Sequence, residues 1–255
     1  MYRMIQTKTA EQVEKMAAAG LILTRCLQML RSSARPGVTT KELDTAAEKF
    51  IRSQGAEPAF KGYRGFPGSI CASPNSMVVH GIPGPYECRR GDLLSIDVGV
   101  VKDGWVADAA VTVPIGPVSE RARQLLDVTQ AALFAGTGQM RAGNHLGDIS
   151  AAIQRAVEIE GLSIIRTLVG HGIGREMHED PQVPNFGEPD KGPVLEAGTV
   201  LAIEPMVNAG GPLVEIGDDG WAVYSKDGSL AAHFEFTVAV TADGPRILTP
   251  WHEST

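Results

Sequence analysis

The chain has 255 residues, 43% of them hydrophobic and 21% charged, which is typical of a globular protein and excludes a disordered chain. Its net charge of −7 offers no basic surface to a phosphate backbone, so we expect no nucleic-acid partner. The apolar run nearest the start, residues 16–23, is shorter than the roughly 20 residues of a membrane-spanning helix, so we expect no membrane segment.

Two helices are predicted before residue 56. A capping box at Thr9 opens the first, which runs to about Ala34, and a capping box at Thr39 opens the second, which ends at Gly55. Residues 57–85 are rich in glycine, proline and aromatic residues, and we expect a loop with short strands. Such segments often carry function.

The three cysteines are Cys26, Cys71 and Cys88, an odd number without CxxC spacing. They indicate reduced thiols rather than a disulfide framework or a thiolate zinc site. Acidic residues precede the first apolar run and no cleavage-site pattern follows it, which argues against a signal peptide. We therefore expect a cytoplasmic protein.

Residues 93–113 alternate in strand fashion around Asp103-Gly104, which predicts a hairpin with a two-residue turn. In that register, residues whose numbers sum to 207 lie opposite each other, so Asp97 and Asp108 share one face of the hairpin. A three-residue loop would place these carboxylates on opposite faces. A single acid of this kind also has a simple explanation, a strand face exposed to solvent.

The second half of the chain repeats the order of helices followed by strands. Helices are predicted over residues 119–140 and 146–160, and strands over 200–203, 221–224, 233–240 and 246–248. No low-complexity linker separates the halves. The pattern indicates an α+β fold in a single domain, residues 1–255, made of two similar halves.

Three more polar residues interrupt apolar or glycine-rich stretches: His171, Glu204 and Glu235. Singly, each could be an edge-strand acid or a histidine that caps a turn. Four carboxylates in one pocket would not have such a simple explanation, because two like charges about 4 Å apart repel by roughly 4 kcal/mol at an effective dielectric of 20. A divalent metal is the simplest way to keep such a group ionised.

Five stretches resemble, in order and spacing, the metal-ligand motifs of type I methionine aminopeptidases, which are M24 metallopeptidases. They are residues 95–99 (Ser-Ile-Asp-Val-Gly), 105–108 (Trp-Val-Ala-Asp), 170–175 (Gly-His-Gly-Ile-Gly-Arg), 202–206 (Ala-Ile-Glu-Pro-Met) and 233–237 (His-Phe-Glu-Phe-Thr). Residues 79–83, residues 177–181 and Trp221 are also similar. The resemblance implies a pita-bread fold, with two pseudo-symmetric halves around an antiparallel sheet and helices on the outside.

The resemblance also implies a role for each ligand. Asp97 would bind one divalent ion, His171 and Glu204 the other, and Asp108 and Glu235 would bridge both. The set would accept cobalt, manganese, iron or zinc, and the sequence does not choose among them. Water activated by the metal would attack the carbonyl after an N-terminal methionine.

Further roles follow from the same resemblance. Glu204 would also handle the proton of the water, while His80 and His178 would contact the scissile amide and the developing oxyanion. The methionine pocket would comprise Phe60, Tyr63, Phe66, Cys71, Met177 and Trp221. For Phe60 and Phe66 an ordinary aromatic core cluster explains the pattern equally well. Arg64 replaces a usual histidine and Met177 a frequent phenylalanine, which leaves substrate preference open.

The expected partner is the N-terminus of a nascent polypeptide, bound by a monomer. Residues 213–226 are acidic where a ribosome-docking relative would favour a basic loop, so we expect at most a weak association with ribosomes. Two alternatives remain. A prolidase or aminopeptidase P would share the fold and ligands but usually carries a large N-terminal domain, and a binding protein of this fold would have lost metal ligands.

Overall fold

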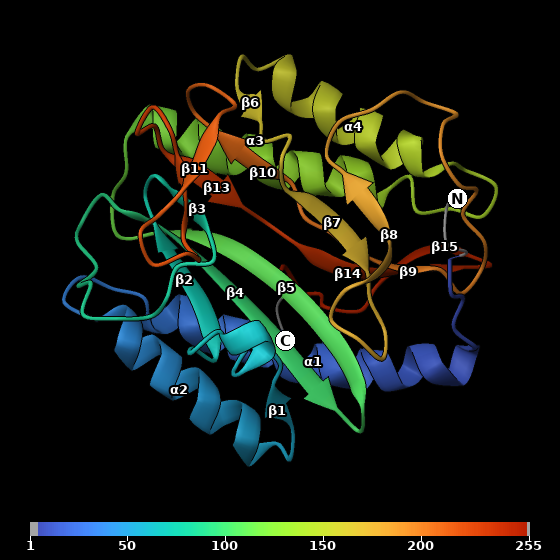
Figure 1. Ribbon diagram of the computed structural model, residues 1–255, viewed down its shortest axis with the longest axis horizontal. Helices are drawn as coiled ribbons and strands as arrows, with labels where there is room; N and C mark the ends of the chain where they lie inside the picture. Colours follow the sequence, from blue (N-terminus) through green and yellow to red (C-terminus); the bar gives the residue numbers. More distant parts are fainter. Residues whose placement is uncertain (1–4, 254–255) are drawn as a thin grey trace.

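Two pairs of helices enclose the strands in the computed structural model, which describes residues 5–253 (Figure 1). The predicted domain range, 1–255, therefore includes six residues that lie outside the described part. In Figure 1 the two N-terminal helices lie below the strands and the other two lie above them. This is the arrangement of two similar halves that the sequence predicted.

Within the described residues, all four helices begin within one residue of their predicted starts. They are α1 (Ala10–Ser33), α2 (Thr40–Ser53), α3 (Glu120–Thr137) and α4 (Leu146–Glu158), with one 3-10 turn, η1 (Tyr63–Gly65). Thr9 and Thr39 form the predicted capping boxes, in which the side chain of the third helical residue bonds back to the cap. The side chain of Ser119 accepts a hydrogen bond from the first turn of α3. All four predicted helices are confirmed.

The strands are mostly short. They are β1 (Glu57–Pro58), β2 (Ile70–Pro74), β3 (Met77–Val79), β4 (Leu93–Lys102), β5 (Trp105–Pro114), β6 (Ser163–Ile164), β7 (Val169–Gly172), β8 (Glu179–Pro184), β9 (Val200–Ile203), β10 (Met206–Asn208), β11 (Val214–Ile216), β12 (Val223–Ser225), β13 (Ala231–His233), β14 (Phe236–Thr241) and β15 (Gly244–Ile247). Every described pairing between them is antiparallel.

Each half of the molecule contributes one main sheet. In the first half, β4 pairs with β1, β2 and β5. In the second half the order is β15-β14-β9-β7-β8, and two smaller sheets, β13-β10-β6 and β11-β12-β3, complete the structure. The β3 strand belongs to the first half of the chain but pairs with β12, so the halves are also joined at this edge.

The long hairpin of β4 and β5 has the predicted register. Asp97 lies opposite Ala110, and Asp108 lies opposite Gly99. The turn residues Asp103 and Gly104 both have positive φ, 51° and 74°, as a two-residue hairpin turn requires. The two aspartates therefore lie on the same face of the hairpin.

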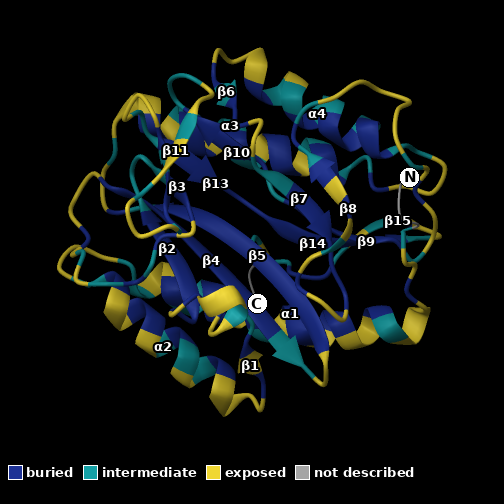
Figure 2. Ribbon diagram, viewed as in Figure 1, coloured by how far each residue is buried: buried dark blue, intermediate teal, exposed yellow. Residues whose placement is uncertain are grey.

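The strands are buried and the helices cover them, as the dark blue hairpin and the partly yellow helices of Figure 2 show. One apolar cluster contains residues of both halves, including Leu27 of α1, Leu133 of α3 and Phe236 of β14. Trp251, near the end of the described chain, packs on Phe236 with ring centroids 5.0 Å apart. The core is thus continuous across the halves.

The predicted single strand over residues 233–240 is wrong. The structure divides it into β13, which pairs with β10, and β14, which pairs with β9, and between them the backbone N–H of Glu235 donates to the carbonyl oxygen of Ala110 in β5. The strand predicted at 221–224 begins later, at Val223, and leaves Trp221 in the preceding turn. Strands β6, β7, β8, β10 and β11 were not predicted.

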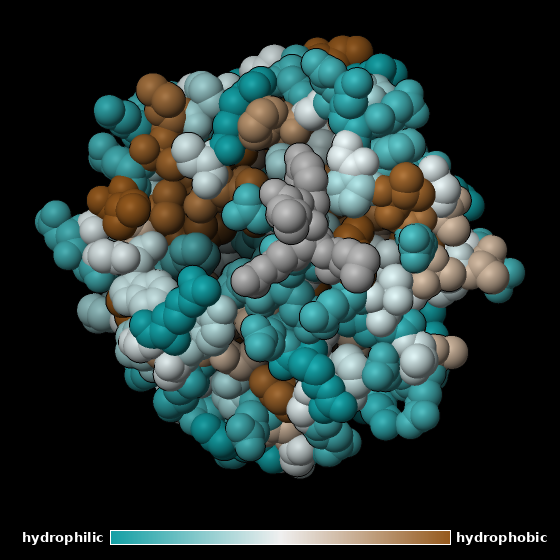
Figure 3. Space-filling model, turned by 45° about the vertical axis from the view of Figure 1, so that its right-hand side comes forward, coloured by the Kyte–Doolittle hydropathy of each residue, from teal (hydrophilic) through white to brown (hydrophobic). Residues whose placement is uncertain are grey.

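Within residues 5–253, no helix combines the length and the apolar character needed to cross a membrane. The face in Figure 3 is largely hydrophilic, and its hydrophobic atoms gather mainly toward the left of the view. Leu213 and Ile216 are among the most exposed large apolar side chains of the described residues, at 66% and 70%.

Candidate metal centre and substrate cavity

A single cavity brings together residues from both halves of the chain. Its wall contains Arg64 and twelve of the residues singled out in the sequence: Phe60, Tyr63, Phe66, Cys71, His80, Asp97, Asp108, His171, His178, Glu204, Trp221 and Glu235. The five proposed ligands come from strands or strand ends, and the apolar members come mainly from the segment between α2 and β2. Met177 is buried in the adjoining apolar cluster but does not line the cavity.

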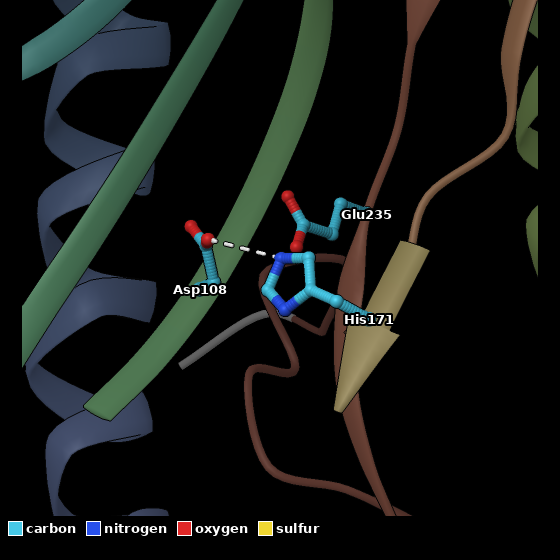
Figure 4. Close-up of side chains that lie close together, drawn as sticks. All are labelled: Asp108, His171 and Glu235. Atoms are coloured by element: carbon cyan, nitrogen blue, oxygen red, sulfur yellow. Dashed lines mark ion pairs between the residues drawn. The ribbon is translucent and has the colours of Figure 1, made fainter. Parts of the chain in front are cut away.

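Three of the predicted ligands form a compact group. Asp108, His171 and Glu235 each offer an atom within 4.8 Å of the others, and Figure 4 shows their side chains directed toward one another. The Nε2 atom of His171 lies 4.0 Å from Oδ2 of Asp108 and 3.5 Å from Oε1 of Glu204. Asp97 and Glu204 line the same cavity but lie outside this compact group.

Side-chain hydroxyl groups fix β5 against the second half at this point. Thr237 of β14 accepts a hydrogen bond from the backbone N–H of Asp108 at 3.0 Å and donates to its carbonyl oxygen at 2.7 Å. Two residues further along β5, the carbonyl oxygen of Ala110 accepts the N–H of Glu235 at 2.9 Å. These contacts hold Asp108 beside Glu235, although 126 residues of chain separate them in the sequence.

Glycines allow the approach of the His171 strand. A Cβ atom at Gly170 would collide with the carbonyl oxygen of Ala202 in β9, and one at Gly172 with that of Asp180. The close backbone packing predicted from the glycine-rich stretch is therefore present.

The carboxylates are costly to ionise without a cation. Burial, reinforced by neighbouring carboxylates, raises the pKa of Asp97, Glu204 and Glu235 well above its ordinary range. Burial also raises the pKa of Asp108 to about 7. One buried oxygen each of Asp97, Asp108 and Glu235 has no hydrogen-bond partner within residues 5–253. Such atoms are what a metal ion would satisfy.

The tautomer of His171 fits the same requirement. Its Nδ1 lies 2.9 Å from the carbonyl oxygen of Gly172, which can only accept, so Nδ1 carries the hydrogen. The lone pair of Nε2 then faces the carboxylates of Asp108 and Glu204. Burial lowers the pKa of His171 to about 3, so the ring is neutral at neutral pH. A neutral imidazole with four carboxylates is a donor set for a divalent metal.

The loop before β8 places His178 at the cavity. Its Nδ1 lies 2.8 Å from the hydroxyl of Tyr63, and its ring centroid lies 4.3 Å from that of His171. The following residue, Glu179, forms a buried ion pair with Lys8 at 2.6 Å and accepts the backbone N–H of Arg175 at 2.7 Å. The N-terminal segment therefore fixes the loop that carries His178.

Aromatic and sulfur-containing side chains form the opposite part of the cavity. Phe66 and Trp221 meet edge to face with ring centroids 5.2 Å apart, and Asp219 holds the backbone of Trp221 through a hydrogen bond of 2.8 Å. Cys71 is buried and lies in β2, directly opposite Asp97. An apolar pocket thus adjoins the polar group.

The model of metallopeptidase family M24 matches residues 14–242. The chain belongs to this family. It is 51% identical to the methionine aminopeptidase of Clostridium perfringens over 96% of this chain and 99% of that one. It also resembles the crystal structure of the Thermotoga maritima methionine aminopeptidase, with a TM-score of 0.95, 43% identity, and coverage of 96% of this chain and 99% of that one.

A prolidase from Pyrococcus furiosus shares the M24 fold, with a TM-score of 0.77 at 22% identity; it matches 98% of this chain but 66% of the prolidase. The family and the pita-bread α+β fold predicted from the motifs are thereby confirmed. Membership of a metallopeptidase family agrees with the divalent-metal requirement expected from the four carboxylates and the imidazole.

Three residues beside the M24 site received no role from the sequence. His233 is buried within 3.6 Å of Glu204, and Thr112 and Thr237 make the hydroxyl bridges between β5 and the second half. One signal for His233 was available, because it lies two residues before Glu235 and strand alternation would place both side chains on one face. The threonine bridges depend on the contact between the halves and leave no local signal.

Proposed function

We propose that this chain is a methionine aminopeptidase that removes the initiator methionine from newly made polypeptides whose second residue is small. The observation that carries the proposal is the single cavity in which a compact acid and histidine group adjoins an apolar, sulfur-containing pocket. The first can activate water at a peptide bond, and the second suits a flexible thioether side chain. The Clostridium perfringens and Thermotoga maritima relatives bear the same activity in their names.

In this proposal, Asp97 would hold one divalent ion, His171 and Glu204 would hold a second, and Asp108 and Glu235 would serve both. The unpartnered buried oxygens and the Nε2 lone pair of His171 support this assignment. The chemistry that divalent ions supply in such a set is Lewis acidity, which makes water a nucleophile near neutral pH and polarises a carbonyl.

The residues of the chain perform the remaining steps. Glu204 accepts the proton of the attacking water and returns it to the leaving amine, because its carboxylate lies in the cavity wall. His178, held by the Tyr63 hydroxyl, donates a hydrogen bond to the carbonyl oxygen as negative charge develops there. His80, on the same wall, contacts the amide of the substrate.

The methionine side chain would enter among Phe60, Tyr63, Phe66, Cys71 and Trp221. Met177 would act from behind the wall, since it packs in the same apolar cluster as Phe60. Arg64 lines the same cavity, with its guanidinium 5.3 Å from the Tyr63 ring.

The test is to strip metal with a chelator, restore manganese, iron, cobalt or zinc singly, and measure cleavage of Met-Ala-Ser, Leu-Ala-Ser and Ala-Pro peptides. We expect cleavage of Met-Ala-Ser to return and that of Leu-Ala-Ser to stay low. Cleavage of Ala-Pro without Met-Ala-Ser would make the chain a prolidase-type enzyme. Cleavage of none, with any ion, would leave the inactive binding protein as the better description.

We further propose that the enzyme works in the cytoplasm as a monomer on nascent chains, with at most a weak ribosome association and no nucleic-acid or membrane partner. The acidic segment 213–226 and the buried, unpaired state of Cys26, Cys71 and Cys88 support this. Cell fractionation and light scattering test it. A stable dimer or tight co-sedimentation with ribosomes would contradict it.

A further inference from the structure

His233 is a buried imidazole for which the proposed reaction has no use. Its side chain is 2% exposed, and neither ring nitrogen has a hydrogen-bond partner within the described residues. A buried polar group without a partner is rare in native proteins and calls for an explanation. Among the described residues, the carboxylates of two glutamates face Nε2, with Oε2 of Glu204 at 3.6 Å and Oε2 of Glu235 at 3.9 Å.

The position of His233 relative to the cavity separates it from the metal ligands. The cavity wall contains all five proposed ligands but not His233, and His233 is not part of the compact group of Asp108, His171 and Glu235. The two oxygens of Glu204 face different histidines: Oε1 faces His171, and Oε2 faces His233. His233 therefore lies on the side of the Glu204 carboxylate that is turned away from the cavity.

Hydrogen bonds to a side-chain hydroxyl fix the backbone of His233, as they fix that of Asp108. Its N–H donates to Oγ1 of Thr112 at 2.8 Å, and the same hydroxyl donates to its carbonyl oxygen at 2.9 Å. Because this hydroxyl has one hydrogen, Ser95, 2.8 Å away, must be the donor to it. A chain of hydroxyl groups from β4 and β5 thus fixes the start of the His233 side chain.

We propose that His233 is a positioning residue, whose Nε2–H orients the carboxylates of Glu204 and Glu235 for metal binding. Carboxylates that hold a cation are ionised and can only accept hydrogen bonds, so the ring nitrogen facing them must carry the hydrogen. The imidazole bridges the two glutamates from behind. Residues that orient ligands in this way set the metal affinity of a site. The inference rests on the proposed metal-binding set.

The test compares His233→Gln, whose amide retains an N–H donor, with His233→Leu, which removes it at similar bulk. Chelator-stripped proteins are titrated with Mn²⁺ in a calorimeter, and their folding is checked by circular dichroism. We expect His233→Leu to bind Mn²⁺ about 10- to 100-fold more weakly at unchanged stoichiometry. His233→Gln should retain most of the affinity of the unsubstituted protein.

Each outcome decides the matter. Unchanged Mn²⁺ affinity in His233→Leu would overturn the proposal, and so would an equal loss in both variants, which would make the imidazole itself a ligand. If His233→Leu does not fold, the affinity of His233→Gln decides alone. Because the measurement is of metal binding, it stays distinct from methionine cleavage: an unsubstituted protein that binds Mn²⁺ without cleaving Met-Ala-Ser refutes the proposed activity only.

Discussion

Replacing Asp108 by asparagine should have opposite effects on activity and on the stability of the metal-free protein. The substitution keeps the size of the side chain but removes a charge from the centre of the proposed metal set, so peptidase activity should be lost while the fold is retained. Without metal, however, the charge of Asp108 destabilises the folded state, because burial disfavours the ionised carboxylate. The metal-free variant should therefore be the more stable protein.

The magnitude follows from the pKa. Burial moves the pKa of Asp108 from 3.8 to about 7, and three pKa units at 1.36 kcal/mol each amount to about 4 kcal/mol. The pKa of Asp108 is higher in the folded state than in the unfolded state, so below about pH 4, where the group is protonated in both states, it does not lower the free energy of unfolding. As the pH rises through 7, ionisation favours the unfolded state and the free energy of unfolding falls. Relaxation of the neighbouring acids reduces the effect, so we expect about 2–4 kcal/mol at pH 8.

Urea unfolding in the presence of chelator, at pH 5 and pH 8, measures this difference. Asp108→Asn should exceed the unsubstituted protein at pH 8, and the gap should narrow toward pH 5. Asp103→Asn in the turn of the same hairpin is the matched control, since its side chain is 77% exposed and asparagine tolerates positive φ. A metal-free Asp108→Asn protein that is less stable than its parent at pH 8 would refute the electrostatic reasoning.

Three further changes test single contacts. Thr237→Val removes the hydroxyl that bridges to Asp108 and should cost about 1–3 kcal/mol in urea unfolding, since it leaves buried backbone groups unpaired; an unchanged midpoint would contradict the bridge. Tyr63→Phe should lower kcat/KM about fivefold through loss of the bond to His178, with stability unchanged; equal kinetics would show that the bond does not position the ring. Gly99→Ala would place a Cβ 2.8 Å from two side-chain carbons of the apolar cluster beside the methionine pocket. It should raise KM for Met-Ala-Ser, and a normal KM would mean that this cluster does not shape the pocket.

The local rules of the sequence were sufficient for the helices and the hairpin. Capping at Thr9 and Thr39 is a property of a few neighbouring residues, and so is the turn at Asp103. The hairpin register followed from that turn because side chains alternate strictly along strands. No contact with a distant part of the chain was needed.

Local rules could not predict that the five candidate ligands converge. Spacing could not bring Glu204 and Glu235 to Asp108, and only the family resemblance of the surrounding motifs predicted their meeting. The break before β14 was missed because Glu235 takes its backbone partner from Ala110, a contact between the halves that a local apolar pattern does not encode. His233 was overlooked because a histidine in an apolar strand has a structural explanation by default.

The hydroxyl bridges between β5 and β14 also bear on how the chain assembles. A cut in the loop at residues 115–119 would leave Asp97 and Asp108 in one fragment and His171, Glu204 and Glu235 in the other. Neither fragment alone would hold the full donor set, so an ion would favour only the docked pair, as any ligand favours the state that binds it. In this enzyme the metal would serve as a removable cross-link between two pieces of one polypeptide, and its affinity would report how firmly they interlock.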